Sequence, residues 1–133
     1  LRRLEIPCVL FDQTYEEYPG RNVGFDFYKG GMMATRYLIE CGHRDIAFAS
    51  GPLDRRSRKQ RLDGYKAALR ESGIRFNSRR LLVCNVSGDA DGENAEFCNG
   101  YALGEQLLAS ECLPDAVVAG SIIFISAILL NRR

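Results

Sequence analysis

The chain has 133 residues, of which 46% are hydrophobic and 26% are charged, and this composition is typical of one globular domain. Lys and Arg number 18 against 17 Asp and Glu. The net charge is therefore too small to attract the chain strongly to nucleic acid or to an anionic membrane. The composition excludes collagen-like, low-complexity and largely disordered proteins, and we do not expect this chain to bind DNA by itself.

Five cysteines are scattered without a C-x-x-C spacing, and His43 is the only histidine. This pattern predicts neither a disulfide framework nor a zinc site, so we expect no metal and no cofactor. Unpaired cysteines are typical of the reducing cytoplasm, which is the predicted location. The sequence starts without Met or an apolar signal segment, and we expect it to be a piece of a longer protein.

The first third of the chain predicts two short strands and one helix. The strands are the apolar runs at 8–11 and 22–25, which turn residues separate. Small or apolar residues then recur at helical spacing over 28–41, and Gly42 is predicted to end this helix in a left-handed conformation. The inward positions predicted for this helix are Gly31, Ala34, Leu38 and Cys41.

The middle of the chain predicts a strand at 45–49 and a second helix that ends at Gly73. Ser57 followed three residues later by Gln60 is a capping-box pattern, so Ser57 is predicted to be the helix N-cap. The apolar stripe predicted to face the core of the protein consists of Leu62, Tyr65, Ala68 and Leu69.

The last third predicts a strand at 81–86, a helix at 95–110 and a strand at 115–119. The inner positions predicted for this helix are Cys98, Tyr101, Ala102, Leu107 and Leu108. The run 116–130 is almost wholly apolar, but its 15 residues are fewer than the about 20 that a membrane span needs, so we expect a buried strand and then a buried helix. This alternation of strands and helices predicts an α/β fold, a three-layer αβα sandwich with a parallel sheet.

Short motifs along the chain resemble the sequence motifs of one protein family, in the same order. They are 6–12 (IPCVLFD), 23–26 (VGFD) with 30–31 (GG), 37–39 (YLI) with 42–44 (GHR), 50–53 (SGPL), 61–65 (RLDGY), 100–101 (GY) and 114–116 (PDA). Their order and spacing resemble the effector-binding domain of lac-repressor-like (LacI/GalR) bacterial transcription regulators. The resemblance implies a periplasmic binding protein type I-like fold, in which two α/β lobes close on a small molecule. Residues 1–26 would be a remnant of the first lobe and 27–133 the second lobe, with the DNA-binding headpiece and the C-terminal strands missing.

The resemblance also implies a ligand site, because in open α/β sheets ligands bind beyond the carboxyl ends of the strands. Arg61 matches the arginine of the family's R-x-x-G-[YWF] motif, and its planar fork suits adjacent hydroxyls or a carboxylate. Arg55, Ser57 and Asp12 match positions that contact ligands in some relatives. For each of these four residues an ordinary role stays open: a solvated cation for both arginines, a helix cap for Ser57 and a turn for Asp12. Ser121 could keep one hydrogen bond to a ligand.

Two departures from the family pattern concern this site. Relatives usually carry Asp-Asn where this chain has Asp26-Phe27, and Asn-Asp or Ser-Asp where it has Ser121-Ile122. Helix capping explains Asp26 without any ligand. Ile122 puts the usual sugar contacts in doubt.

The function implied by the resemblance is binding of a small-molecule effector, most simply a sugar, in a transcriptional regulator. Alternatives are a purine- or nucleoside-sensing regulator of the same family and a periplasmic sugar-binding receptor. An enzyme is not expected, because the chain lacks the phosphate-binding glycine loops and the G-x-S-x-G nucleophile motif. The implied partners are the effector, DNA through the missing headpiece, and a second copy in a homodimer; no membrane partner is expected.

Overall fold

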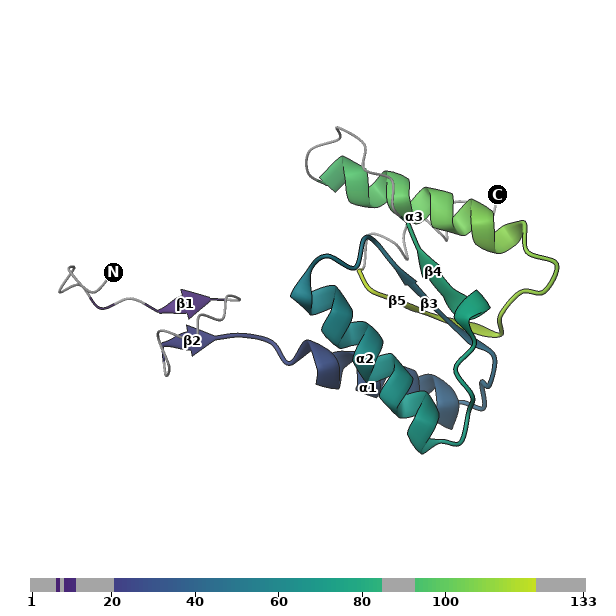
Figure 1. The fold of residues 1–133 in the computed structure, drawn as a ribbon, viewed down its shortest axis with the longest axis horizontal. Helices are drawn as coiled ribbons and strands as arrows, with labels where there is room; N and C mark the ends of the chain where they lie inside the picture. Colours follow the sequence, from purple (N-terminus) through teal and green to yellow (C-terminus); the bar gives the residue numbers. More distant parts are fainter. Residues whose placement is uncertain (1–6, 8, 12–20, 85–92, 122–133) are drawn as a thin grey trace.

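The computed structural model describes residue 7 and residues 9–11, 21–84 and 93–121. Two parallel sheets occur in these residues (Figure 1). Strand β1 (Leu10–Phe11) pairs with β2 (Asn22–Val23), and this small pair lies apart from the rest of the molecule at the end of an extended segment. The other sheet has three strands in the order β4-β3-β5, all parallel.

The three-stranded sheet is the middle layer of a sandwich. Helices α1 and α2 cover one face of the sheet and α3 covers the other (Figure 1). This arrangement confirms the predicted three-layer αβα fold with a parallel sheet. The elements of the sandwich are α1 (Phe27–Glu40), β3 (Ile46–Ser50), α2 (Arg56–Glu71), the 3-10 turn η1 (Ser78–Arg80), β4 (Leu81–Val83), α3 (Glu93–Leu108) and β5 (Ala116–Ala119).

The central strand β3 is buried over its whole length, and its side chains alternate between two cores. Ala47 and Ala49 face α3, where they pack with Leu82, Cys84, Leu103 and Leu107. Ile46 and Phe48 face α2, where they pack with Leu62, Tyr65, Leu69 and Val118. A strand buried on both faces reads as a continuous apolar run, which is why the sequence predicts it well.

Helix α1 and helix α2 cross at two glycines. A β-carbon added to Gly31 would lie 2.2 Å from the carbonyl oxygen of Arg61, and one added to Gly64 would lie 2.1 Å from the carbonyl oxygen of Tyr28. The two backbones therefore approach more closely than any side chain at either position would allow. This close crossing fixes the position of α1 against the first half of α2.

Helix termini follow the sequence prediction at three positions. The carboxylate of Asp26 caps α1 by accepting the backbone N–H of Lys29 at 2.8 Å. Gly42, with φ of 98°, and Gly73, with φ of 69°, follow the ends of α1 and α2 in the left-handed region that favours glycine.

The prediction that Ser57 caps α2 is wrong. The cap is Arg55, whose backbone is extended (φ −80°, ψ 132°) and whose carbonyl accepts the backbone N–H groups of Arg58 and Lys59. Ser57 therefore lies inside the first turn of the helix and is not its N-cap residue. Backbone conformation, set by the turn after β3, decides the start of this helix over the capping preference of serine.

The inward faces predicted for α1 and α3 are partly wrong. Ala34 and Cys41 are exposed in and after α1, whose buried positions are Gly31 and Thr35. In α3, Cys98, Tyr101 and Leu108 are exposed, whereas Asn99, Gly100, Leu103, Gly104 and Leu107 are buried. The buried faces of both helices use glycine and polar residues for close packing, so the apolar residues alone do not reveal them.

Two predicted elements are covered only in part, or not at all, by the described residues. The predicted strand at 81–86 is observed as Leu81–Val83, and residues 85–86 lie outside the described residues, as does the predicted helix at 122–130. In the part of the chain that the structure describes, every helix is too short or too polar to cross a membrane.

Candidate functional site

The carboxyl ends of β3, β4 and β5 meet at one edge of the sheet, because all three strands are parallel. The chain leaves β3 through Ser50, Gly51 and Pro52 into the start of α2, and it leaves β5 through Gly120 and Ser121. Helix N-termini and the carboxyl ends of strands gather at such an edge, which is where ligands bind in open α/β sheets.

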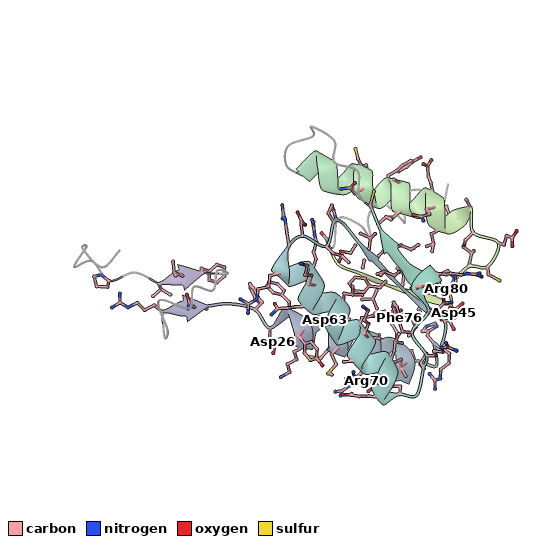
Figure 2. All side chains as sticks on the ribbon, in the orientation of Figure 1. Asp26, Asp45, Asp63, Arg70, Phe76 and Arg80 are labelled. Carbon is pink, nitrogen blue, oxygen red and sulfur yellow. The ribbon has the colours of Figure 1, made fainter. Side chains whose placement is uncertain are left out.

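Arg61 lies beside this edge between α1 and α2. Its guanidinium carbon is 4.5 Å from the centre of the Phe27 ring, which is a cation–π contact. A pocket of about 490 Å³ is lined by Arg61 together with Phe25, Asp26, Phe27 and Gly30. Figure 2 shows Asp26 where the segment from β2 enters α1, so this pocket lies at the junction between the β1–β2 pair and the sandwich.

The other arginine and the serine predicted for the site lie at the start of α2. Arg55 is exposed at the N-cap, and its backbone N–H donates to the carboxylate of Asp54 at 2.8 Å. Ser57 is half-buried in the first turn. The first turn contains no acidic residue and the Arg55 side chain makes no capping hydrogen bond, so the carboxylate of Asp54 is the acidic group at this end of the helix.

Of the remaining predicted site residues, Asp12 lies outside the described residues. Ile122, which departs from the family pattern, also lies outside them. Ser121 is half-buried directly after Gly120 at the end of β5. The structure therefore brings Arg55, Ser57 and Ser121 to the carboxyl edge of the sheet, with Arg61 in the adjoining pocket.

Sequence reasoning missed Arg58 as a buried residue of this edge. Its residue exposure is only 8%, and its Nη1 donates to the carbonyl of Pro52 at 3.0 Å and lies 3.6 Å from the carboxylate of Asp54. A β-carbon on Gly51 would be 3.1 Å from the guanidinium carbon of Arg58. The signal that could have found it is helical spacing, since position 58 continues the stripe of Leu62 towards the sheet.

Ser50 ends the central strand at the same edge and is fully buried. Its hydroxyl oxygen has no hydrogen-bond partner among the described residues. A β-carbon on Gly120 would lie 3.1 Å from this hydroxyl oxygen, so the glycine leaves the room that the hydroxyl occupies. Buried polar atoms in proteins usually have a hydrogen-bond partner, which can be an ordered water.

The opposite, amino edge of the sheet also holds charged groups, but they pair with each other. Arg80 binds the carboxylate of Asp45, with its Nε 2.6 Å from Oδ1, and this hydrogen bonding raises the pKa of Arg80. The backbone N–H of Arg44 donates to Asp115 at 3.0 Å and lowers the pKa of that carboxyl. Burial raises the pKa of Tyr65 to about 12. These contacts give the amino edge a structural role.

The described residues contain no group of three or more His, Cys, Asp or Glu side chains that could hold a metal ion. The chemistry available at the carboxyl edge is therefore that of arginines, serine hydroxyls, backbone N–H groups and aromatic rings. This set binds polar small molecules by hydrogen bonds and stacking.

A parallel αβα sandwich with such a binding edge is the architecture of a periplasmic-binding-protein-like lobe and of other open α/β folds. The family described as periplasmic binding proteins and sugar binding domain of the LacI family matches residues 3–121. The match covers most of the chain, and the chain belongs to this family. The resemblance inferred from the sequence motifs is confirmed.

Named relatives agree with this family. The ribose operon repressor of Escherichia coli (strain K12) is 38% identical over 116 residues, which are 87% of this chain and 32% of the repressor. The HTH-type transcriptional repressor PurR of Escherichia fergusonii is 40% identical over 93 residues, which are 70% of this chain and 25% of that protein. This chain thus spans a third or less of the length of these relatives, which are named as repressors rather than as enzymes.

A solved structure shows the same fold. The regulatory protein of the LacI family from Chloroflexus aggregans superposes with a TM-score of 0.74 at 25% identity, over 92% of this chain and 41% of that one. The fold prediction, a periplasmic binding protein type I-like sandwich, is confirmed by this similarity and by the family match.

Proposed function

We propose that this chain binds a small-molecule effector, a sugar or a related metabolite, for a DNA-binding transcriptional regulator. The observation that carries the proposal is the position of Arg61, with its guanidinium stacked on Phe27 in a pocket at the junction of the two sheets. Arg61 would donate to ring hydroxyls of the effector, and the aromatic rings of Phe25 and Phe27 would cover its apolar face.

The division into lobes is part of this proposal. Residues 1–26 would belong to a first lobe and 27–133 to the second, and the separate position of the β1–β2 pair supports this division. An effector between the lobes would stabilise one arrangement of them over another. It could change DNA binding only by its different affinity for the two arrangements.

The partners follow from the family. DNA would be bound through a headpiece outside this chain, since the net charge here is only +1. A cytoplasmic location fits the names of the relatives as repressors, and a homodimer is part of the proposal that no relative's name supports. We propose no catalytic step, because the groups at the carboxyl edge suit binding.

A purine- or nucleoside-sensing regulator is the second candidate. The 40% identity to the repressor PurR of Escherichia fergusonii favours it, and so does the aromatic lining of the pocket, since Phe25 and Phe27 could stack on a base. A periplasmic sugar-binding receptor has the same fold, but the relatives named above favour a regulator.

Calorimetric titration of the full-length protein with ribose and with adenosine tests the proposal. We expect one of the two to bind, and we expect Arg61→Ala to weaken that binding on the order of tenfold to a hundredfold, because a charge-assisted hydrogen bond contributes roughly 1.5–3 kcal/mol. The matched control is Arg70→Ala, which removes the same charge from the far end of the same helix (Figure 2). Equal ligand affinities of wild type and Arg61→Ala would show that Arg61 does not contact the effector.

A further inference from the structure

A second pocket lies towards the opposite end of α2 from Arg61. Its volume is about 460 Å³, which is in the range of small-molecule sites. The last turns of α2 and the segment after the helix form its walls, with the lining residues Lys66, Arg70, Gly73, Ile74, Arg75 and Phe76. Three of these side chains are cationic and none is acidic. The pocket therefore has the size and charge of a site for a small anion.

The turn that ends α2 holds one wall of this pocket in place. Gly73 has a φ of 69°, and the backbone N–H of Ile74 donates to the carbonyl of Leu69 at 2.9 Å. Ile74 and Phe76 then pack against the buried apolar cluster between α2 and the sheet. The Phe76 ring also meets the Tyr65 ring nearly at a right angle, with the two centroids 6.3 Å apart. This side of the pocket is thus an apolar surface with a fixed position.

Lys66, Arg70 and Arg75 form no ion pair with any residue that the structure describes. The ammonium of Lys66 lies over the Phe76 ring, 5.0 Å from its centre, and Figure 2 shows Arg70 at the far end of α2. Lys66 and Arg70 are four residues apart on one helix, where like charges repel each other. An anion bound in the pocket would offset this repulsion.

The dipole of α2 explains only one of these cations. A positive charge in the last turn of a helix is favourable, so Arg70 is stabilising there without any ligand. The effect is confined to the last turn, whereas Lys66 precedes that turn and Arg75 follows the helix. The carbonyls of Ala68, Leu69 and Arg70 accept backbone N–H groups from the turn after the helix. The negative end of the dipole therefore does not present bare carbonyls to an incoming anion.

We propose that this pocket binds an organic phosphate, a phosphate monoester that carries an apolar group. Lys66, Arg70 and Arg75 would bind the phosphate oxygens, because guanidinium groups match phosphate geometry and a phosphate monoester carries more than one negative charge at neutral pH. The apolar group would pack on Ile74 and Phe76. This site is separate from the pocket of Arg61, so the inference does not rest on the proposed function.

Calorimetric titrations of the full-length protein with phenyl phosphate, inorganic phosphate and phenol test this inference. Phenyl phosphate should bind about tenfold more tightly than inorganic phosphate, because its ring adds apolar contact with Ile74 and Phe76. Phenol is uncharged at neutral pH, and it should bind at least about tenfold more weakly than phenyl phosphate.

Variants of the lining residues locate the phosphate. Arg75→Met removes the charge from an exposed side chain and should weaken phenyl phosphate binding roughly threefold to tenfold. Combining it with Lys66→Gln should weaken this binding on the order of tenfold to a hundredfold. Arg79→Met is the matched control, because Arg79 is also an exposed arginine but does not line the pocket, and its affinity should stay within about twofold of wild type.

Equal affinities of wild type and the double variant for phenyl phosphate would overturn the inference. No preference for phenyl phosphate over inorganic phosphate, or no binding of either, would also overturn it. Loss of phenyl phosphate binding in Arg61→Ala but not in the double variant would place the phosphate in the pocket of Arg61 instead. Each of these results leaves the proposed function intact, because that function is tested separately with ribose and adenosine, which carry no charge.

Discussion

Gly31 of α1 lies against the backbone of Arg61 in α2, so closely that a β-carbon on the glycine would be 2.2 Å from the arginine carbonyl oxygen. The reciprocal contact joins Gly64 to the carbonyl of Tyr28. Helix packing therefore fixes the backbone of the residue whose side chain stacks on Phe27 at the candidate site. A substitution at this helix crossing should therefore shift the position of Arg61 in the candidate site.

Gly31→Ala should lower the free energy of unfolding by about 2–3 kcal/mol, because the added methyl group meets backbone atoms that cannot rotate away. The neighbouring Gly30→Ala is the matched control. A β-carbon on Gly30 has no atom within 4 Å, and alanine favours the helix by up to about 1 kcal/mol. Urea unfolding of both variants measures the difference. Similar stabilities of the two variants would contradict the close crossing.

Tyr65 makes stability depend on alkaline pH. Its buried hydroxyl donates to the carbonyl of Ile46 at 2.8 Å, and burial raises the pKa of Tyr65 to about 12, against about 10 in an unfolded chain. Below pH 10 both states keep the phenolic proton. Between pH 10 and 12 only the unfolded chain releases it, so this contribution to the unfolding free energy is lost as pH rises, by about 2–3 kcal/mol.

Tyr65→Phe tests this pH dependence. The variant should lose about 1 kcal/mol at neutral pH with its hydrogen bond, and its stability should fall less steeply than that of wild type between pH 10 and 12. Tyr37→Phe is the control, because Tyr37 is 66% exposed and should leave the wild-type slope unchanged. Parallel stability curves for wild type and Tyr65→Phe would show that Tyr65 does not cause the alkaline loss.

The amino edge of the sheet should affect stability without affecting effector binding. Figure 2 shows Arg80 and Asp45 side by side at this edge, and Arg80 also donates to the carbonyl of Cys112 at 2.7 Å. Arg80→Ala should lower the unfolding free energy by about 1–3 kcal/mol, because it removes charge-assisted hydrogen bonds from a mostly buried side chain. Effector affinity, measured by calorimetry well below the melting temperature, should stay within about twofold. A loss of affinity comparable with that of Arg61→Ala would place part of the site at this edge.

The fold could be predicted from the sequence because its strands are short apolar runs separated by turn chemistry. Strand β3 reads as continuously apolar, and the glycines after α1 and α2 mark the helix ends. The start of α2 could not be predicted in the same way. Ser57 has a strong capping preference, yet the extended backbone of Arg55 begins the helix two residues earlier.

The site was harder to predict, because burial of a charged residue is not visible in a run of charges. Arg55, Arg56, Arg58 and Lys59 look alike in sequence, but only Arg58 lies on the helix face that packs on the sheet. Ser50 likewise looks like an ordinary strand end. Its unpartnered hydroxyl becomes apparent only when the neighbouring strands and α2 surround it.

We propose that an effector binds at the carboxyl edge of the three-stranded sheet, next to Arg61. A crystal structure of the full-length protein with ribose or adenosine, whichever binds more tightly, shows directly where the effector lies. We expect a ligand within hydrogen-bond distance of the Arg61 guanidinium and in contact with Phe27. A ligand bound instead in the basic pocket formed by Lys66, Arg70 and Arg75, or at the amino edge beside Asp45 and Arg80, would contradict it.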